Sequence, residues 1–440
     1  MAHQDGHFPP REELAALITR PVSPRWKQIS LLLAILGIVV FVVGAATGQE
    51  RAWQAWHVNW LFFSVIASSG VLLSAVQRIT TARWSRAVIR FSEASVAFMP
   101  VAFLMLLVTV IGKAHTFHWV HEPPAQPEKA LWLDPTFWTI RVLGIFGILT
   151  ALSIWYVYTA VRLDVGVVPE WGANWAKGLR ARMRAGFGDE RRELHTTHSI
   201  QGRLAVFLTL VFGFGWVILS WDLSMSVDYH FQSTMYGWQF FMGGWLCNLM
   251  FLALVARAWR NQMGAHHVVT DSHFHDIGKL GFAFTAFWGY LTFAQLLVIW
   301  YGNFAEETHF FRARLIEPWT SLTVASGMLA FVLPFFGLLG KYPKIFTPTM
   351  AFFATSSLVG IWLHRYLEIY PITHAGATAL PLGLWEIGTF LGYLGVWGYT
   401  YLQFMDAFPR MRVFLMTSKY RDEVQVPCDP KTMEPLPAHE

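Results

Sequence analysis

The chain of 440 residues is short of charge, because only 14% of its residues are Asp, Glu, Lys or Arg while 54% are hydrophobic. A soluble domain carries about 25% charged residues, so this chain lacks the charge needed to solvate a globule of its length. Its apolar runs are continuous rather than alternating, which favours membrane-spanning helices over a barrel. We therefore predict an all-α polytopic membrane protein.

Cysteine is equally scarce. Cys247 lies in a predicted span and Cys428 in the C-terminal tail, so we expect neither a disulfide nor a zinc site. The chain also lacks a GxGxxG, P-loop or CxxC motif, so we expect any nucleotide or iron–sulfur site to lie outside this chain. The basic residues are concentrated in a few loops, a pattern that indicates membrane topology rather than nucleic-acid binding.

Ten apolar runs of about 20 residues or more are long enough to cross a bilayer. They lie near residues 29–48, 53–77, 87–112, 137–161, 199–221, 232–256, 277–301, 317–340, 347–369 and 379–404. A polar segment precedes the first run, so we do not expect a cleaved secretory signal. With ten crossings, 26 of the 33 Lys and Arg residues fall on one side, which we expect to be the cytoplasm and to hold both termini.

Helices two to five of this series resemble helices six to nine. Trp216 and Asp222 are six residues apart, as are Trp362 and Glu368. The alternative is chance similarity between aromatic-rich spans. We predict two four-helix bundles in parallel repeat, with helices one and ten flanking them. The predicted segments are a cytoplasmic segment 1–28, a first flanking helix 29–52, a first bundle 53–221 with a cytoplasmic loop 163–198, a second bundle 222–370, a tenth helix 371–409 and a cytoplasmic tail 410–440.

Ionisable side chains inside the spans are the first candidates for chemistry, because charge in hydrocarbon is costly. Glu93 falls inside the third helix and Glu386 inside the tenth. The hypothetical proton path comprises Glu93, Asp276, Lys279, Tyr290, Gln295 and Glu386. The alternative is a structural role in helix packing, and Asp276 and Lys279 could simply be an exposed pair.

A second group of polar residues is expected at the outer side. It comprises His57, Asp222, Asp228, His230, His364, Arg365 and Glu368. His364 and Glu368 are four residues apart and share one helix face. Histidine changes charge near neutral pH, so this group suits either proton exit or uptake of protons from a quinol. The alternative is that these residues cap helices and pair with one another.

Metal chemistry is not predicted. His266, His267, His273 and His275 lie close together in sequence, but their spacing fits no ligand template. Haem is not expected either, because His57 and His364 have no partner at coordinating spacing.

The second half of the chain resembles the NrfD/PsrC-type membrane subunits of respiratory complexes. The resemblance is closest to the second such subunit, ActF-like, of bacterial alternative complex III, a quinol:cytochrome c oxidoreductase. The residues that carry it are Trp221-Asp222, Met225-Ser226, Ser233-Thr234-Met235-Tyr236-Gly237, His275-Asp276-Ile277-Gly278-Lys279-Leu280, Gln295, Ile299-Trp300-Tyr301-Gly302-Asn303, Glu306-Glu307-Thr308 and His364-Arg365-Tyr366-Leu367-Glu368. The first half is supported only by the repeat and the helix count.

This resemblance implies a subunit of a hetero-oligomeric complex in the bacterial cytoplasmic membrane, contributing to quinol oxidation, to transmembrane proton translocation or to both. The implied partners are a homologous membrane subunit, a periplasmic iron–sulfur protein, cytochrome c subunits and lipids. Haem c and iron–sulfur clusters would sit on those partners, with no cofactor bound covalently here. In such complexes the quinol pocket is attributed to the other membrane subunit, so quinone binding by this chain is a hypothesis. We do not expect the chain to be catalytic alone.

Two other functions fit the same features. One is the membrane anchor of a molybdopterin oxidoreductase of the polysulfide-reductase type. The other is an ion-coupled transporter, for which a parallel repeat with polar groups near the membrane midplane would also serve. Transporters usually have broken helices at their site, whereas we expect the helices of the repeat to be unbroken apart from Pro100 and Pro334.

Overall fold

The fold consists of helices over the residues that the computed structural model describes, which are 10–18, 20–168, 172–420 and 423–424. No strand occurs in this part of the chain. Eight helical segments are long and apolar enough to cross a membrane. They are α2 (Pro24–Ala46), α3 (Glu50–Ile79), α4 to α5 (Ile89–Ile111), α7 (Pro135–Val167), α9 with the turn that follows it (Glu190–Asp228), α10 (Thr234–Met263), α11 (Asp271–Gly302) and α13 to α14 (Thr320–Gly337). The predicted all-α membrane class is confirmed.

Two further helices, α16 (Thr347–Thr373) and α17 (Leu384–Ala407), are equally long but are not among these eight. They coincide with the spans predicted near 347–369 and 379–404. In α16, Arg365 and Glu368 are both buried inside the protein. A helix enclosed by protein can carry such groups, which lowers its mean hydropathy below that of a lipid-facing span.

Two of the spans are interrupted. The third is divided into α4 (Ile89–Glu93), the 3₁₀ turn η1 (Ala94–Phe98) and α5 (Met99–Ile111); the eighth is divided into α13 (Thr320–Gly327), the π-helical turn η6 (Met328–Val332) and α14 (Leu333–Gly337). In both cases the helix after the break has a proline, Pro100 or Pro334, as its second residue. Proline has no N–H for the carbonyl four residues earlier, so the helix adopts another hydrogen-bonding pattern there. The first break follows Glu93 directly.

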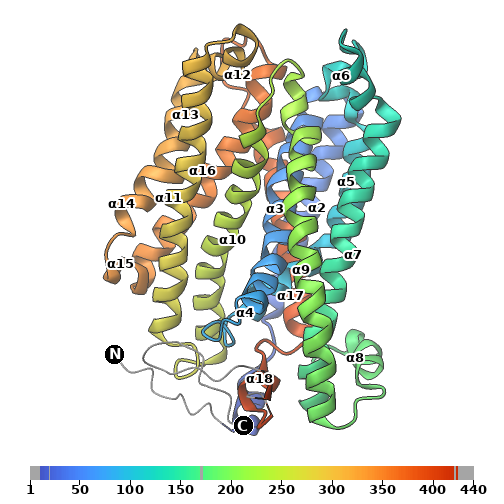
Figure 1. The fold of residues 1–440 in the computed structure, drawn as a ribbon, viewed down its shortest axis with the longest axis vertical. Coiled ribbons are helices and arrows are strands. Elements are labelled where there is room, and N and C mark those ends of the chain that lie inside the picture. Colours follow the sequence, from blue (N-terminus) through green and yellow to red (C-terminus); the bar gives the residue numbers. More distant parts are fainter. Residues whose placement is uncertain (1–9, 19, 169–171, 421–422, 425–440) are drawn as a thin grey trace, which may run out of the picture.

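Short helices connect the long ones. They are α1 (Arg11–Ile18), α6 (Pro127–Trp132), α8 (Lys177–Arg184), α12 (Ala305–Leu315), α15 (Lys341–Ile345) and α18 (Val413–Thr417), with the turns η2 (Lys113–His115), η3 (His118–Val120), η4 (Asn174–Ala176) and η5 (Met225–Asp228). Figure 1 shows α8 and α18 at the lower end of the molecule and α6 and α12 at the upper end. The long helices run between these ends.

The helix at the centre of the molecule is α3. All residues of its apolar 18-residue stretch are buried inside the protein (100%), whereas in α2 only 22% of the corresponding residues are buried. α3 contacts α5, α7, α9, α10 and α17, and α10 in turn contacts α11 and α16. α2 lies along α17, where a Cβ built on Gly37 would come within 2.1 Å of the Gly392 Cα. Small residues allow two backbones to approach this closely in a membrane. Because one side of α2 packs on α17, the exposed apolar side chains of α2 lie on its other side, where they can contact lipid.

Candidate functional site

Four acidic side chains that the sequence places in the spans are almost fully buried, and each forms an ion pair with arginine. The pairs are Glu93 with Arg90 and Arg412, Asp222 with Arg141, Glu368 with Arg365, and Glu386 with Arg51. An isolated carboxylate in a low-dielectric interior is very costly, and a guanidinium offsets that cost through charge-assisted hydrogen bonds. Two of these pairs belong to larger polar clusters.

The first, which we name the lower cluster, lies near the lower end in Figure 1, where α4 meets α3, α7 and the segment after α17. It consists of Ser74, Arg90, Glu93, Tyr156, Asp164 and Arg412. The Glu93 carboxylate accepts from the Arg412 guanidinium and, at 2.5 Å, from the Ser74 hydroxyl. Its second oxygen lies 2.8 Å from Nη1 of Arg90. Glu93 is thus held by groups from three separate parts of the chain.

Arg90 extends this cluster to a second acid. Its Nη2 lies 2.5 Å from Oδ2 of Asp164, and the backbone N–H of Phe414 donates to Oδ1 of Asp164 at 2.8 Å. The Tyr156 hydroxyl donates to the Ser74 carbonyl oxygen at 3.0 Å. Two arginines and two carboxylates give the cluster a formal charge near zero, which makes its burial tolerable.

Local sequence explains only part of the lower cluster. Arg90 and Glu93 are three residues apart in α4, a spacing that places both on one helix face. Arg412 comes from the connection between α17 and α18, where Arg410 donates from Nε to the Met405 carbonyl oxygen at 2.9 Å. This turn folds the chain back toward the helices after α17 ends at Ala407, and it carries the Arg412 guanidinium to Glu93.

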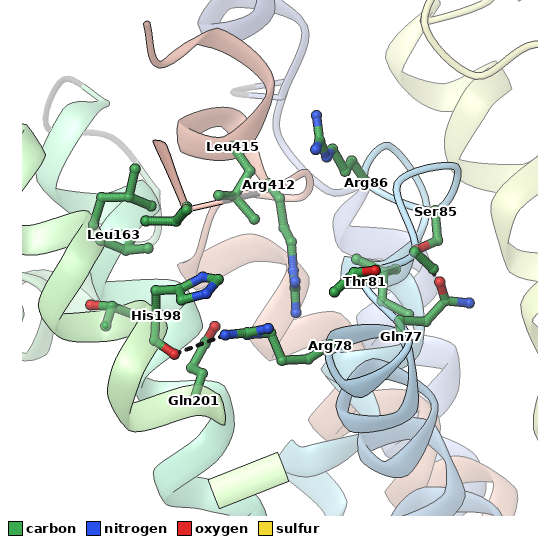
Figure 2. A pocket seen from close by; sticks show the side chains of 15 residues that line it. Gln77, Arg78, Thr81, Ser85, Arg86, Leu163, His198, Gln201, Arg412 and Leu415 are labelled. Carbon is green, nitrogen blue, oxygen red and sulfur yellow. Dashed lines mark hydrogen bonds between the residues drawn. The ribbon is translucent and has the colours of Figure 1, made fainter. Parts of the chain in front are cut away.

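A cavity of about 60 Å³ borders the lower cluster. Its wall includes Arg412 and, further out, the exposed Thr81. Figure 2 shows the side chains of Arg412, Arg78 and His198 converging on it. A smaller neighbouring cavity is lined by both Arg412 and Asp164. Since a buried water needs at least about 10–15 Å³ of such space, the larger cavity has room for a few waters beside the ion pairs.

The upper cluster surrounds Glu368 on α16 and consists of Ser224, Tyr236, Gln239, His364, Arg365 and Glu368. Arg365 donates to one Glu368 oxygen, and the Ser224 hydroxyl donates to the other at 3.0 Å. Ser224 and Tyr236 share a hydrogen bond of 2.6 Å between their hydroxyls. His364 Nε2 lies 3.5 Å from the Glu368 carboxylate and 2.9 Å from the Gln239 amide nitrogen.

Close packing fixes Arg365 in this cluster. Its Nη2 donates to the Phe240 carbonyl oxygen at 2.9 Å, and its guanidinium carbon lies 3.7 Å from the centre of the Phe240 ring. A Cβ built on Gly243 would come within 2.8 Å of the same nitrogen. Glycine at 243 therefore makes the room that the guanidinium occupies. Nearby Arg314 on α12 donates from Nε to the Leu367 carbonyl oxygen at 2.7 Å, and burial lowers its pKa to about 10, so it stays charged at pH 7.

Of the seven residues predicted at the outer side, His364, Arg365 and Glu368 lie together. Asp222 instead accepts two hydrogen bonds from Arg141, at 2.7 and 2.8 Å, and one from the Trp132 indole at 3.0 Å. The His57 ring is buried, with Nε2 at 2.5 Å from the carbonyl oxygen of Leu223, the residue after Asp222.

The other two residues of that group lie in the turn after α9. The Asp228 carboxylate accepts from the His230 backbone N–H at 3.2 Å and lies 3.3 Å from Nδ1 of His309. The His230 ring packs on Tyr229, with the ring centres 4.1 Å apart. The predicted outer group is therefore divided among three neighbouring sets of contacts.

The structure does not bring the six residues of the predicted proton path together. Asp276 and Lys279 form a partly exposed ion pair of 2.6 Å with each other. Tyr290 is 61% exposed. Glu386 caps α17 by accepting from the Gly383 N–H at 2.8 Å.

Glu386 has two further side-chain partners. Glu386 also binds Arg51 through both oxygens, at 2.9 and 2.8 Å, and accepts from the Tyr370 hydroxyl at 3.0 Å. Gln295 is buried in α11, and its amide nitrogen has no hydrogen-bond partner among the described residues. Glu93 alone of the six lies in a buried cluster next to a cavity.

The arginine partners of the buried acids are hard to predict from the sequence. Arg412 falls in the predicted tail 410–440, and the sequence does not show that Arg51, Arg90 and Arg141 pair with buried acids. Only the spacing of Arg90 and Glu93 was a usable signal, because the other partners are 81 to 335 residues away in sequence. Asp164 was placed within the loop 163–198, but it is buried in α7.

Histidines in the connection before α11 have other partners. His273 Nδ1 accepts from the Thr270 N–H at 3.2 Å at the start of α11, and His267 lies 3.3 Å from Glu13. Within the described ranges, no group of three or more His, Cys, Asp or Glu side chains is arranged to hold a metal ion. Cys428 lies outside the described residues, and Cys247 is a buried free thiol.

Comparison with known proteins gives no match, either to a family model or to a curated protein. The two clusters and the residues of the resemblance therefore carry the functional argument.

Proposed function

We propose that this chain is a ten-helix membrane subunit of a quinol-oxidising respiratory complex of the alternative complex III type. Resemblance of the second half to NrfD/PsrC-type subunits supports the family, and the long helices α16 and α17 supply the ninth and tenth crossings. The lower end in Figure 1 would face the cytoplasm, because α8 and its neighbours carry many of the basic residues. In this complex the chain contributes to proton translocation, to quinol oxidation or to both.

The observation that carries the proposal is that Arg412, which pairs with the buried Glu93, lines a cavity. A proton-carrying acid in a membrane must be shielded from lipid yet reachable by water from one side. Glu93 is fully buried, but its partner Arg412 lines the cavity. Protons would reach Glu93 from the cytoplasm by way of waters in this cavity and the hydroxyl of Ser74.

Arg412 is placed to control this step. With the Arg412 guanidinium in contact, two arginines stabilise the Glu93 carboxylate; with it withdrawn, only Arg90 remains and the carboxylate loses part of that stabilisation. Arg412 belongs to the short connection between α17 and α18 rather than to a span. A small movement of this connection would therefore release Glu93 without moving a long helix.

The upper cluster is the proposed place where a quinol, or protons released from one, meets the chain. The His364 side chain is 23% exposed while Glu368 beside it is 1% exposed, so His364 is the accessible edge of the cluster. A quinol gives up two protons and two electrons on oxidation to quinone. His364 and Glu368 would take up protons, and the electrons would pass to iron–sulfur clusters and haems of partner subunits.

Proteoliposomes that contain the purified complex test the proton role. Glu93→Gln should lower the number of protons translocated per electron while quinol oxidation continues. Asp276→Asn is the matched control, because it makes the same chemical change in a partly exposed ion pair. Unchanged proton translocation in an assembled Glu93→Gln complex would contradict the proposal.

The quinol role has a separate test. In the same complex, His364→Leu combined with Glu368→Gln should raise the KM for quinol and lower turnover. If the assembled double variant keeps both values of the wild type, the upper cluster has no part in quinol oxidation and only the proton role remains.

A further inference from the structure

The cavity beside the lower cluster is strongly cationic. Three arginines, Arg78, Arg86 and Arg412, line it together with His198, and none of its lining residues is Asp or Glu. They reach it from different parts of the chain, namely the end of α3, the connection to α4, the first turns of α9 and the segment before α18. Glu93 compensates Arg412 and Arg86 has other interactions within the chain, so the charge that a bound anion would compensate is that of Arg78.

Acids close to this cavity are already engaged. Glu93 and Asp164 pair with Arg90 and Arg412 within the lower cluster. Glu193, next to the lining residue Leu194, pairs with Arg162 at 2.9 Å. Glu423, next to the lining residue Val424, lies 2.7 Å from Arg191. Within the described part of the chain, Arg78 forms no ion pair with a carboxylate.

Hydrogen-bond donors remain available on the cavity wall. Arg78 uses Nη2 to donate to the His198 carbonyl oxygen at 3.0 Å, whereas its Nε is buried without an acceptor. The Nε of Arg412, whose side chain is itself about nine-tenths buried, also has no acceptor. Thr81 and Ser85 add hydroxyl groups. Guanidinium and hydroxyl donors around a small cavity are the groups that bind phosphate oxygens.

We propose that this cavity binds a phosphate group, supplied either by the headgroup of an anionic lipid or by free phosphate. The phosphate would lie between Arg78 and Arg412 and accept from their free Nε–H groups. Basic pockets between helices at the cytoplasmic ends of spans suit the headgroups of anionic lipids. The volume of about 60 Å³ admits a phosphate group but not a larger headgroup as a whole. This site does not depend on the respiratory role proposed above.

Binding is measured on the purified full chain in neutral detergent, by titrating phosphatidylglycerol, phosphatidylcholine or inorganic phosphate and following the thermal unfolding midpoint. Arg78→Gln removes a donor, and Ala82→Leu fills the cavity without changing charge. Arg182→Gln, on the exposed face of α8 at the same end, is the matched control. We expect the first two variants to raise, about tenfold or more, the ligand concentration needed to stabilise the chain. The control should leave that concentration unchanged.

The separate titrations with lipid and with inorganic phosphate distinguish a lipid headgroup from free phosphate. Stabilisation by phosphatidylglycerol but not by inorganic phosphate identifies a lipid headgroup, and stabilisation by inorganic phosphate alone identifies a free anion. The proposal is overturned if neither stabilises the wild type. It is also overturned if Arg78→Gln and Ala82→Leu both bind like the wild type, or if Arg182→Gln weakens binding as much as Arg78→Gln does.

Discussion

The lower and upper clusters use the same chemistry, a buried glutamate held by arginine, but they hold it in different ways. Glu368 and Arg365 are three residues apart on one helix, and Phe240 and Gly243 enclose the guanidinium. Glu93 also has an arginine three residues away, Arg90, but its second arginine, Arg412, comes from a connection 319 residues away and borders a cavity. The comparison shows that one buried ion pair is formed within a single helix and enclosed by packing, whereas the other joins distant segments of the chain next to a cavity.

The largest effect is expected from removing the arginine of the upper cluster. Arg365→Met leaves the Glu368 carboxylate buried with only neutral donors, which should cost about 3–5 kcal/mol of stability. Thermal unfolding of the purified chain measures this loss. A double variant that also carries Glu368→Gln should recover part of it, because no buried charge then remains. An unchanged midpoint in Arg365→Met would show that the upper pair is not enclosed as described.

A smaller loss is expected from the equivalent change in the lower cluster. Arg412→Met leaves Glu93 paired with Arg90, so we expect a cost of about 1–3 kcal/mol, below that of Arg365→Met. The same unfolding assay compares the two variants side by side. If Arg412→Met proved the more damaging, the lower pair would be the more firmly held and the distinction between the clusters would be lost.

Packing around the upper arginine gives a third comparison. Gly243→Ala places a methyl group 2.8 Å from Arg365 Nη2 and should destabilise the chain by about 1–3 kcal/mol. Gly144→Ala in α7 is the control, because a Cβ there meets nothing within 4 Å. We expect the control to unfold at or slightly above the wild-type temperature. Equal midpoints for both variants would mean that Arg365 has room to move.

The smallest effect is expected at Asp222, which resembles the upper cluster in being enclosed. Trp132→Phe removes one hydrogen bond of 3.0 Å but leaves both bonds from Arg141, so we expect a loss of about 0.5–1.5 kcal/mol. Thermal unfolding again provides the measurement. A loss as large as that of Arg365→Met would show that the indole, rather than Arg141, dominates the site.

Much of the fold was predictable from the sequence because apolar runs have a length that the bilayer dictates. The helical membrane class followed directly, and each predicted span contains a long helix or an interrupted one. The breaks next to Pro100 and Pro334 were less predictable, since proline indicates where a helix changes but not whether the span continues. Burial of Arg365 and Glu368 in α16 could not be read from its composition either.

The candidate site was harder to predict because ion pairs join residues that are distant in sequence. Glu93 was identified as a buried acid by its depth in a span. Its partner Arg412 was assigned to the tail, since counting basic residues treats each one as a solvated charge. The pairing of Arg51 with Glu386 was missed for the same reason. A sequence pattern reports where a charge lies along the chain but not which opposite charge the fold brings to it.

Infrared difference spectroscopy of the reconstituted complex tests most directly whether Glu93 exchanges a proton during turnover. The reduced-minus-oxidised spectrum should contain a carbonyl stretching band of a protonated carboxylic acid. We predict that Glu93→Gln removes this band and that Asp276→Asn leaves it in place. A band that persists unchanged in an assembled Glu93→Gln complex would contradict the account, and Glu93 would then serve only to hold the helices together.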